Sequence, residues 1–380
     1  VTIDDGETCD DGNQENETCP YGERSCVICN SECKLSPGNV SFCGDGTVNG
    51  DEFCDVPEST ETCDDQCRPA DAFISVWRTT ADNEVVTLPL KEGFDYDFQV
   101  SWGDGTTGQV DAFDSDAKTH VFERPGDYEI TISGTLPTIS FLDKPERLKI
   151  YTIPNLGDTG WQDFAFAFKG CSNLTHVSGG DLAQVTTIEG MFLDATNVTP
   201  DVSEWDTSQV SNMSSAFENT SAANPQVSNW NTQNVTSMAS MFESASIANP
   251  DVKNWDISNL QDASSMFKDA PFANPDLSNW DVRALQDVSG LFYNAISAYP
   301  SMTSWVPNAV NNAANMLRAT DIGIHRYSPL LIQLAAHNNI EDVNLDGGDA
   351  TYTYAASIAR TSLTSKGWTI TDGGPGYFSS

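Results

Sequence analysis

Apolar side chains recur at a constant spacing over the second half of the chain. Tryptophans occupy every twenty-fifth position, and so does a pair of neighbouring apolar residues between them. The two series are Trp205, Trp230, Trp255, Trp280 and Trp305, and Met191-Phe192, Ala216-Phe217, Met241-Phe242, Met266-Phe267, Leu291-Phe292 and Met316-Leu317. A short period held without insertion indicates one unit stacked on copies of itself, because a single unit cannot bury its apolar face alone. The sequence therefore predicts a solenoid.

The pattern inside one unit predicts its secondary structure. Met238, Met241 and Phe242 follow the i, i+3, i+4 spacing of a short helix with one apolar face. Pro250 ends that helix, because the residue before a proline is pushed out of the helical region. Trp255 then lies on a short extended segment with its side chain inward. One strand and one helix in each repeat unit predict a leucine-rich-repeat-like solenoid.

The pattern changes at both ends of the repeats. Residues 71–140 contain short alternating runs, AFISVW, VVTLPL, YDFQVSW and DYEITISG, separated by turn residues, which predict a small β-sandwich. The solenoid is assigned to residues 141–320. In residues 321–380, SPLLIQLAAHN and YAASIARTSLTSKG predict two helices, and GWTITDG predicts a last strand, as a C-terminal cap. The predicted fold class is mixed β and α/β.

Residues 1–70 form a fourth block, which is rich in cysteine and has 17 acidic and 3 basic side chains. Such a block cannot build an apolar core, so we expect disulfides to stabilise it in an oxidising compartment. Its cysteines are Cys9, Cys19, Cys26, Cys29, Cys33, Cys43, Cys54, Cys63 and Cys67. Nine is an odd number, so one of them lacks a partner within the block. The alternative for Cys26, Cys29 and Cys33 is part of a zinc site.

The charge of the chain excludes one class of partner. The chain has 55 Asp and Glu against 18 Lys and Arg, a formal net charge of -37. Phosphate backbones require a basic surface, so we expect no nucleic-acid partner. The chain begins at Val1 without a leader and has no apolar run of membrane-spanning length, so we expect an exported protein whose signal peptide has been removed and which has no membrane span.

Three stretches of the sequence resemble known families. CGDGTVNGDEFCD and the cysteines that follow resemble the myxobacterial-type cysteine-rich repeat, of which GETCDDGN would be a second, incomplete copy. FQVSWGDGTTGQV with THVFERPGDYEITISG resembles the PKD-type immunoglobulin-like domain. The repeats from Trp161 to Leu317, as in ANPDVKNWDISNLQDASSMFKDA, resemble those of BspA-family leucine-rich-repeat surface proteins. This last resemblance implies an extracellular binding or adhesion surface without enzymatic chemistry.

The turn between strand and helix carries polar residues in every unit. Stacked at the spacing of the units, these residues would form a polar column able to bind an extended glycan or peptide, or would only be a solvated face. The polar column consists of Ser211, Asn212, Thr236, Ser237, Gln261, Asp262, Gln286, Asp287, Asn311 and Asn312.

Two stretches match the first half of a calcium-binding loop, in which alternate oxygen ligands are followed by glycine at the sixth position. The candidate ligands are Asp45, Asn49 and Asp51 in one stretch, and Asp342, Asn344 and Asp346 in the other. Both stretches lack the acidic twelfth residue. A plain turn is the alternative, and calcium is the only cofactor that the sequence suggests.

No catalytic constellation is visible in the sequence. The four histidines, His120, His176, His325 and His337, are scattered, and no nucleophile or zinc-protease motif accompanies them. GDGTTG matches a dinucleotide fingerprint, but a strand pattern follows it instead of a helix. We therefore predict a non-catalytic bacterial protein at the cell surface that binds an extracellular protein or glycan. The alternatives are a subunit of an extracellular filament or layer made of copies of itself, and a carbohydrate-targeting accessory protein.

Overall fold

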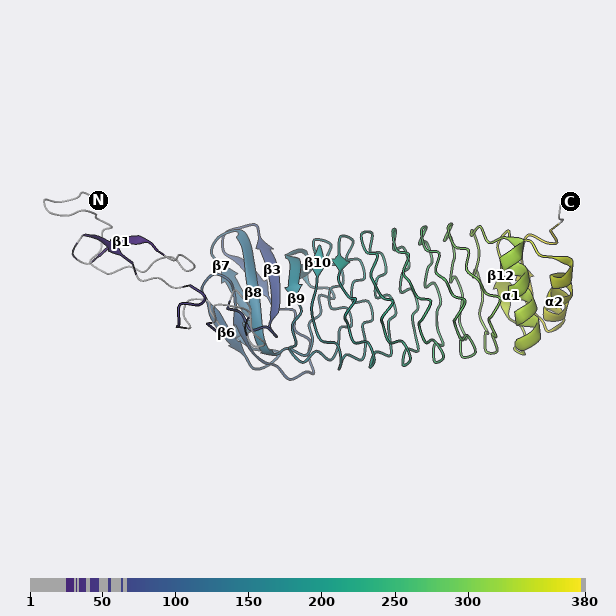
Figure 1. Ribbon diagram of the computed structural model, residues 1–380, viewed down its shortest axis with the longest axis horizontal. Helices are drawn as coiled ribbons and strands as arrows, with labels where there is room; N and C mark the ends of the chain where they lie inside the picture. The colour runs from purple at the N-terminus through teal and green to yellow at the C-terminus, as the bar shows by residue number, and fades with distance from the viewer. Residues whose placement is uncertain are drawn as a thin grey trace.

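The computed structural model describes residues 25–30, 32, 34–38, 42–47, 54–55, 63 and 67–376. This part of the chain is elongated (Figure 1). A small cysteine-rich module lies at one end, followed by a β-sheet domain and a long stack of thin units. Two helices close the other end. The order along the axis therefore follows the order along the chain.

Disulfides cross-link the N-terminal module. Strands β1 (Val27–Cys29) and β2 (Leu35–Pro37) form an antiparallel pair. Disulfides join Cys43 to Cys67 and Cys54 to Cys63. Cys26 and Cys29 are also disulfide-bonded, so the zinc alternative is wrong for them. Cys9, Cys19 and Cys33 lie outside the described residues.

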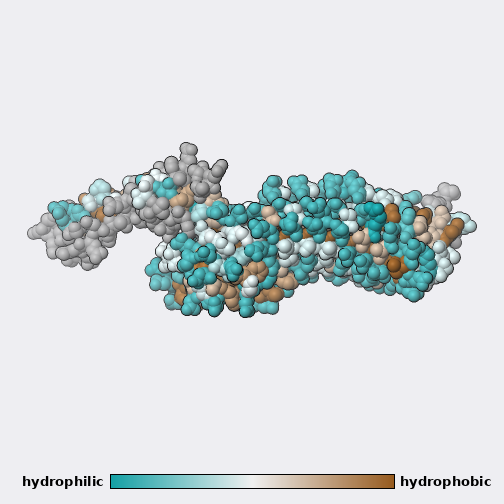
Figure 2. Space-filling view, turned by 90° about the horizontal axis from the view of Figure 1, so that it is seen from below, coloured by the Kyte–Doolittle hydropathy of each residue, from teal (hydrophilic) through white to brown (hydrophobic). Residues whose placement is uncertain are grey.

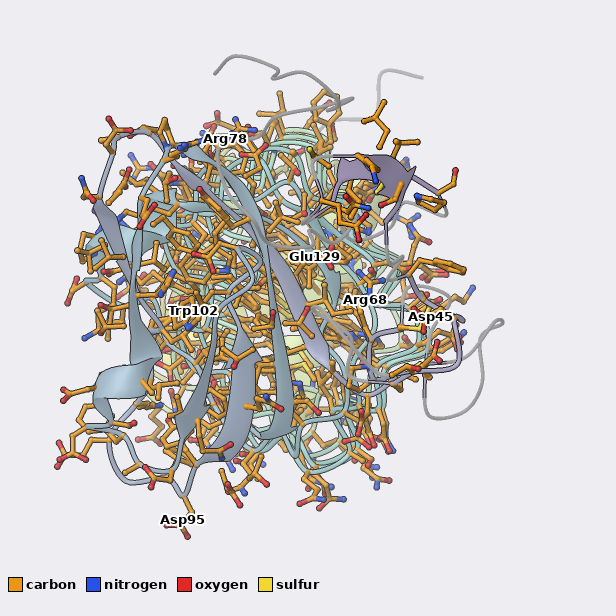
Figure 3. All side chains as sticks on the ribbon, turned by 90° about the vertical axis from the view of Figure 1, so that its left-hand side faces the viewer. Asp45, Arg68, Arg78, Asp95, Trp102 and Glu129 are labelled. Atoms are coloured by element: carbon orange, nitrogen blue, oxygen red, sulfur yellow. A yellow bond between two sulfur atoms is a disulfide. The ribbon has the colours of Figure 1, made fainter. Side chains whose placement is uncertain are left out.

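The module joins the β-sheet domain through polar contacts. The Arg68 guanidinium lies 2.8 Å from a carboxylate oxygen of Glu129, on a strand of the main sheet (Figure 3). The side-chain amide of Asn155 donates to the carbonyl oxygens of Ala70 and Ala72, both at 3.2 Å. The connecting segment is thus held by two different strands, β8 (Gly126–Thr135) and β9 (Ile150–Asn155).

The β-sheet domain contains the strands that the alternating runs predict. The elements are β3 (Phe73–Thr79), β4 (Glu84–Thr87), β5 (Asp97–Ser101), β6 (Thr107–Val110), η1 (Asp116–Lys118), β7 (Thr119–Phe122), β8 (Gly126–Thr135), η2 (Pro145–Leu148), β9 (Ile150–Asn155), β10 (His176–Val177) and β11 (Thr199–Pro200). β4 pairs with β7, and the other strands form one sheet of order β11-β10-β9-β3-β8-β5-β6. β10 and β11 belong to the first repeat units, so the sheet continues past residue 140 into the repeats.

The GDGTTG stretch is a hairpin connection between β5 and β6. The Trp102 amide donates to the Thr106 carbonyl at 3.0 Å, which closes the turn. Gly103 has a φ of +76°, and a Cβ there would lie 2.4 Å from the Glu129 carbonyl oxygen. Only glycine fits this close approach of two backbones. The turn chemistry therefore explains the glycines, and the stretch opens no helix for a dinucleotide.

The repeat stack, residues 161–317, has no helix in its units. In each unit two residues four positions apart have a positive φ, such as Ser215 with Asn219 and Ser240 with Ser244. This left-handed conformation does not continue an α-helix of L-residues. Alternate backbone amides donate to the next unit instead of to their own turn. In one unit the donors Met213, Ser215, Phe217 and Asn219 pair with the carbonyls of Ser237, Ala239, Met241 and Glu243 at 2.8–3.0 Å.

The predicted fold class, with a leucine-rich-repeat-like solenoid, is therefore wrong. Among the described residues the only α-helices lie in the C-terminal cap, and most units contribute single parallel bridges in place of strands. The i, i+3, i+4 spacing of apolar residues was correct for the buried face. It did not separate a helix from a series of tight turns, because both return to the same face every three to four positions.

Aromatic rings fill the centre of the stack. The regularly spaced tryptophans, from Trp205 to Trp305, are at most 4% exposed, which confirms their predicted inward orientation. The rings of Phe217, Phe242 and Phe267 stack nearly parallel, with centroids 5.5 and 5.7 Å apart. The indoles are also hydrogen-bonded: Trp255 Nε1 donates to the Val227 carbonyl at 2.9 Å. One apolar core runs from Phe73 in the sheet to Trp368 in the cap.

The C-terminal cap completes the last unit. It contains α1 (Ile324–His337), β12 (Asn344–Asp346), α2 (Tyr354–Ser365) and β13 (Thr369–Thr371). Both helices and the last strand appear where the sequence predicts them. β12 takes the place of a further unit, because the amides of Ala313 and Leu317 donate to the carbonyls of Asn344 and Asp346 at 3.1 and 3.0 Å. The open backbone groups of the last unit are satisfied in this way.

Neither cap helix is long and apolar enough to cross a membrane, and no other helix of the described residues is either.

Candidate binding face of the repeats

Backbone pairing aligns the polar column. Parallel bridges join equivalent residues of neighbouring units, in the series Asn212, Ser237, Asp262, Asp287 and Asn312. The preceding residue of each pair donates its amide to the unit before, as Thr236 does to the Ser211 carbonyl at 2.9 Å. Two chain positions therefore repeat in register across five units. The structure places all ten residues of the column together, in line along the stack.

The two residues of each pair have different surroundings. The first residues, Ser211, Thr236, Gln261, Gln286 and Asn311, are exposed, whereas the second residues are half-buried. The second residues cap the following turn: Asp262 Oδ1 and Asp287 Oδ1 each accept a backbone amide two residues on, at 2.8 Å. The exposed first residues, here called the outer ladder, are therefore the ones available to a ligand.

Four side chains of the outer ladder contact one another or the backbone of the previous unit: those of Ser211, Thr236, Gln261 and Gln286. Thr236 Oγ1 donates to the Ser211 carbonyl at 3.2 Å, and Gln286 Nε2 lies 3.5 Å from Gln261 Oε1. These contacts orient the side chains but leave them on the surface. The face of the molecule in Figure 2 is largely hydrophilic along the stack, with hydrophobic residues gathered near the C-terminal helices.

The calcium candidates have less favourable surroundings. Asp45 accepts backbone amides of Phe42 and Thr47, at 3.3 and 2.9 Å, and Asn49 and Asp51 lie outside the described residues. Asn344 and Asp346 belong to strand β12, which is extended and does not wrap around an ion. Asp346 Oδ1 accepts the Gly348 amide at 2.8 Å. No group of three His, Cys, Asp or Glu suited to a metal occurs in the described residues, so calcium stays a prediction.

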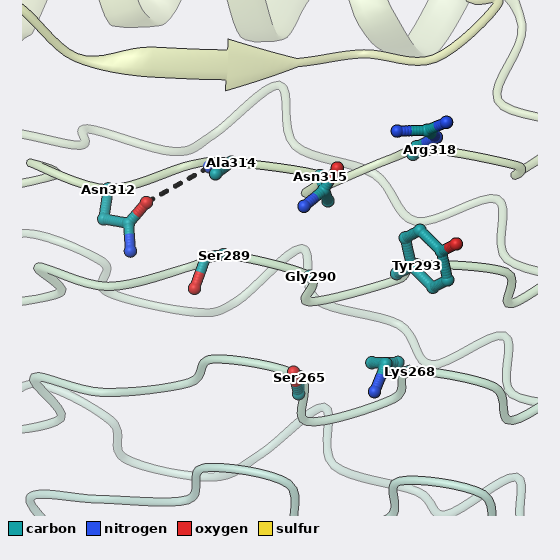
Figure 4. Close-up of a pocket in the computed structure, with 9 residues that line it drawn as sticks. All are labelled: Ser265, Lys268, Ser289, Gly290, Tyr293, Asn312, Ala314, Asn315 and Arg318. Carbon is teal, nitrogen blue, oxygen red and sulfur yellow. Dashed lines mark hydrogen bonds between the residues drawn. The ribbon is translucent and has the colours of Figure 1, made fainter.

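A hollow that the sequence analysis missed lies beside the polar column. It has a volume of about 540 Å³ and spans three units (Figure 4). Lys268, Tyr293 and Arg318 occupy one position of successive units and form one side of it. Gly290 forms its floor, at a position where three earlier units have serine. The signal for this site was in the sequence: the repeat departs from its own pattern at several positions of neighbouring units.

The charge of this hollow, here called the basic hollow, differs from that of the rest of the stack. Earlier units have Glu218 and Glu243 where these three have Lys268, Tyr293 and Arg318. Burial, and next the neighbouring acidic side chains, raise the pKa of the Glu218 carboxyl, although Ser215 and Lys268 oppose this. Lys268 pairs with Glu243, which raises the pKa of the Lys268 ammonium group. Lys268 also lies 3.9 Å from Asp269, so Arg318 is the cation of the hollow that no described carboxylate pairs with.

One side-chain contact in the β-sheet domain joins a histidine to an aspartate. His120 Nε2 lies 2.7 Å from Asp104 Oδ2, and the His120 ring stacks on Trp102 with centroids 5.0 Å apart. Burial disfavours the charged form of Asp104, but hydrogen bonds from Thr106 and His120 outweigh it, and the pKa of Asp104 is lowered. The arrangement fixes the turn after β5.

Cys171 is buried and free, and burial raises the pKa of its thiol. A thiol held protonated in this way is a poor nucleophile. It therefore adds no reactive group to the repeat stack.

The comparisons with known proteins concern the repeats. A family model described as "Mycoplasma protein of unknown function, DUF285" matches residues 162–274 and 213–323. No curated protein matches the chain, and no solved structure matches it either. The family match agrees with the predicted BspA-like repeats in general terms, and the disulfides agree with the predicted cysteine-rich module. The PKD-type and leucine-rich-repeat identities receive no support from it. The repeat stack is thus similar to the DUF285 family.

Proposed function

We propose that this chain is a non-catalytic, exported bacterial surface protein, and that it binds an extracellular protein or glycan through the face of the repeat stack that carries the polar column. The cysteine-rich module and the β-sheet domain then act as spacer and mount. The disulfides support export, because such bonds persist in oxidising compartments. The family match of the repeats supports a surface role in general terms.

The observation that carries this proposal is the outer ladder. Five exposed polar side chains lie in register on a backbone that the next unit holds at every step. A rigid row of donors and acceptors binds an extended ligand with little loss of its own conformational entropy. Extended glycans and peptides offer groups at regular intervals, so they are the ligands that match such a row.

The test uses the full chain and a panel of immobilised extracellular proteins and glycans. We expect at least one member of the panel to be retained, and Thr236→Lys with Gln261→Lys to abolish that binding, because two long charged side chains would block the outer ladder. Asn254→Lys is the matched control, since Asn254 is exposed in the same part of the stack but outside the ladder. Equal binding by all variants would contradict the proposal, as would a hydrolase activity lost on replacing a single Asp, Glu or His.

A second candidate function is self-assembly into a filament or layer. Tyr354 and Ile358 lie one turn apart on α2 and are 84% and 67% exposed, at the end of the molecule opposite the cysteine-rich module. An apolar strip at one end favours contact with a second copy. Sedimentation velocity of the full chain would then show concentration-dependent association that Ile358→Ser removes. A monomer at all concentrations would exclude this candidate.

A further inference from the structure

We propose that the basic hollow binds a sugar unit that carries an oxyanion, a carboxylate or a sulfate. This inference rests on the proposed binding function and names the ligand class for one end of the same face. The hollow adjoins the polar column directly, because Asn312 belongs to both. Its lining combines two cations, one aromatic ring and short polar side chains (Figure 4).

Arg318 supplies the positive charge that an oxyanion requires. Carboxylates outnumber Lys and Arg by 55 to 18 in this chain, so a guanidinium without an acidic partner is unexpected. Within the described residues, no hydrogen bond or ion pair involves the side chain of Arg318. Lys268, by contrast, is held by Glu243. Arginine presents a planar fork of donors that matches carboxylate or sulfate oxygens, so Arg318 is the group that an anionic ligand would engage.

Tyr293 lies between the two cations in the column of equivalent positions. Its hydroxyl has no hydrogen-bond partner among the residues that the structure describes. A partly exposed ring offers a flat apolar surface with a polar edge, which suits the C–H face and the hydroxyls of a pyranose. The other units have no aromatic residue at this position, so the ring is specific to this part of the stack; the equivalent residues are Leu193, Glu218, Glu243, Lys268 and Arg318.

The basic hollow also has the space and the polar groups that a sugar unit needs. Gly290 replaces the serine of the three preceding units, and a Cβ at Gly290 would lie 3.1 Å from Ser265 Oγ. The missing side chain deepens the hollow to about 540 Å³, which is within the usual size of a small-ligand site. Ser265 and Asn315 flank the floor, and both side chains can bond sugar hydroxyls. The lining is too polar for an apolar side chain of a peptide.

The test measures binding of four small probes to the full chain by saturation-transfer difference NMR and titration calorimetry. The probes are a galacturonate trimer, the neutral galactose trimer, galactose 6-sulfate and a triglutamate peptide. We expect the galacturonate trimer or the sulfated sugar to bind, and the neutral trimer to bind at least about tenfold more weakly, because a charged hydrogen-bonded pair is lost. The stronger of the two anionic probes identifies the oxyanion.

Three variants locate the site. Arg318→Gln should weaken the anionic probe about tenfold or more, and Tyr293→Leu should weaken both trimers. Gly290→Ser should abolish binding but keep the fold, because Ser215, Ser240 and Ser265 have the same positive φ at this position. Lys253→Gln is the control: it removes one exposed cation of the stack outside the hollow. Unchanged melting temperatures would show that each variant is folded.

Several results would overturn the inference. The inference is wrong if neither anionic sugar binds, or if the neutral trimer binds as tightly as the galacturonate trimer. It is also wrong if the triglutamate peptide binds more tightly than both anionic sugars, or if Arg318→Gln binds the anionic probe as tightly as the unaltered chain does. The proposed function fails separately. If the immobilised panel retains the chain and the hollow variants bind that panel like the unaltered chain, this inference is wrong and the wider proposal stands.

Discussion

The cysteine-rich module and the repeat stack are stabilised in opposite ways. In the module, disulfides join Cys43 to Cys67 and Cys54 to Cys63 across 24 and 9 residues of chain. The stack has one cysteine, Cys171, which is free, and its units are joined by backbone hydrogen bonds and stacked rings. Covalent links stabilise a segment that has little apolar surface to bury, whereas the stack needs only a neighbour on each side.

This difference predicts where each region is vulnerable. The module depends on its redox environment, because reduction removes its cross-links. The stack depends on continuity, because each unit buries its rings against the next one.

A cavity in the middle of the stack should have the largest effect. Trp255 is 3% exposed, its ring lies parallel to that of Trp230, and its indole is hydrogen-bonded. Trp255→Ala should lower the free energy of unfolding by about 3–5 kcal/mol and should split a single transition, because the units on either side lose contact. Denaturant unfolding followed by near-UV circular dichroism measures both. The neighbouring exposed Asn254→Ala should change stability by less than about 0.5 kcal/mol. Identical unfolding curves for the two variants would show that contact between neighbouring units does not stabilise the stack.

Reduction should affect the other region alone. Loss of disulfides such as Cys43–Cys67 and Cys54–Cys63 should lower the free energy of unfolding of the module by about 2–4 kcal/mol, whereas the stack has no disulfide to lose. Limited proteolysis with and without dithiothreitol should show new cleavage within residues 1–70 and unchanged protection of the repeats. A fall in the melting temperature of the repeats under reduction would show that the two regions are coupled.

The cap tests how the end of the stack is held. The Asp372 side chain is 2% exposed and accepts hydrogen bonds from Arg360 Nε at 2.9 Å and from the Tyr327 hydroxyl at 3.1 Å. Asp372→Asn should lower the free energy of unfolding by about 2 kcal/mol, because a half-buried guanidinium loses its charged partner. Hydrogen exchange should then rise in α1 and α2 and stay constant in β8. Asp349→Asn, at an exposed position of the cap, is the control. Faster exchange in both variants would show that the buried carboxylate of Asp372 is not what stabilises the cap.

The β-sheet domain should show a small dependence on acid pH. The pKa of Asp104 is lowered by hydrogen bonds that exceed the effect of burial. An acid with a lowered pKa in the folded state stabilises the fold fully above its unfolded value near pH 4, and this contribution is lost as the pH falls below it. Because Asp104 is partly exposed, we expect it to contribute less than about 1 kcal/mol to the free energy of unfolding. Melting curves from pH 6 to pH 3 should show the difference between the unaltered chain and Asp104→Asn shrinking. A difference that grows toward low pH would contradict a lowered pKa of Asp104.

Much of the local structure was predictable from particular residues. The alternating runs correctly placed β3, β5 and β8, and the two apolar stretches after residue 321 correctly placed α1 and α2. The inward tryptophans followed from their spacing. The helix expected around Met241 and Phe242 was wrong, because Ser240 and Ser244 adopt a positive φ and their neighbours bond to the next unit. Each such amide donates to a carbonyl of another unit, and the pattern of residues within one unit cannot predict that partner.

The candidate site was only partly predictable. Repetition placed the ten residues of the polar column in register, and the structure brings them together. Which residue of each pair faces outward depended on the turn that Asp262 and its counterparts cap. The basic hollow was missed because its members, such as Lys268 and Arg318, belong to different units and each looks like a single exception to the repeat.

Residue type and spacing were enough to predict the period, the inward rings, the cross-linked N-terminal block and the excess of acidic side chains. Three features appear only in the folded chain. The units are series of turns bonded to their neighbours, one sheet and one core pass from Phe73 into the repeats, and Arg318 has no acidic partner among the described residues. These features depend on contacts between different units, and the free energy of such contacts is set by the stack as a whole.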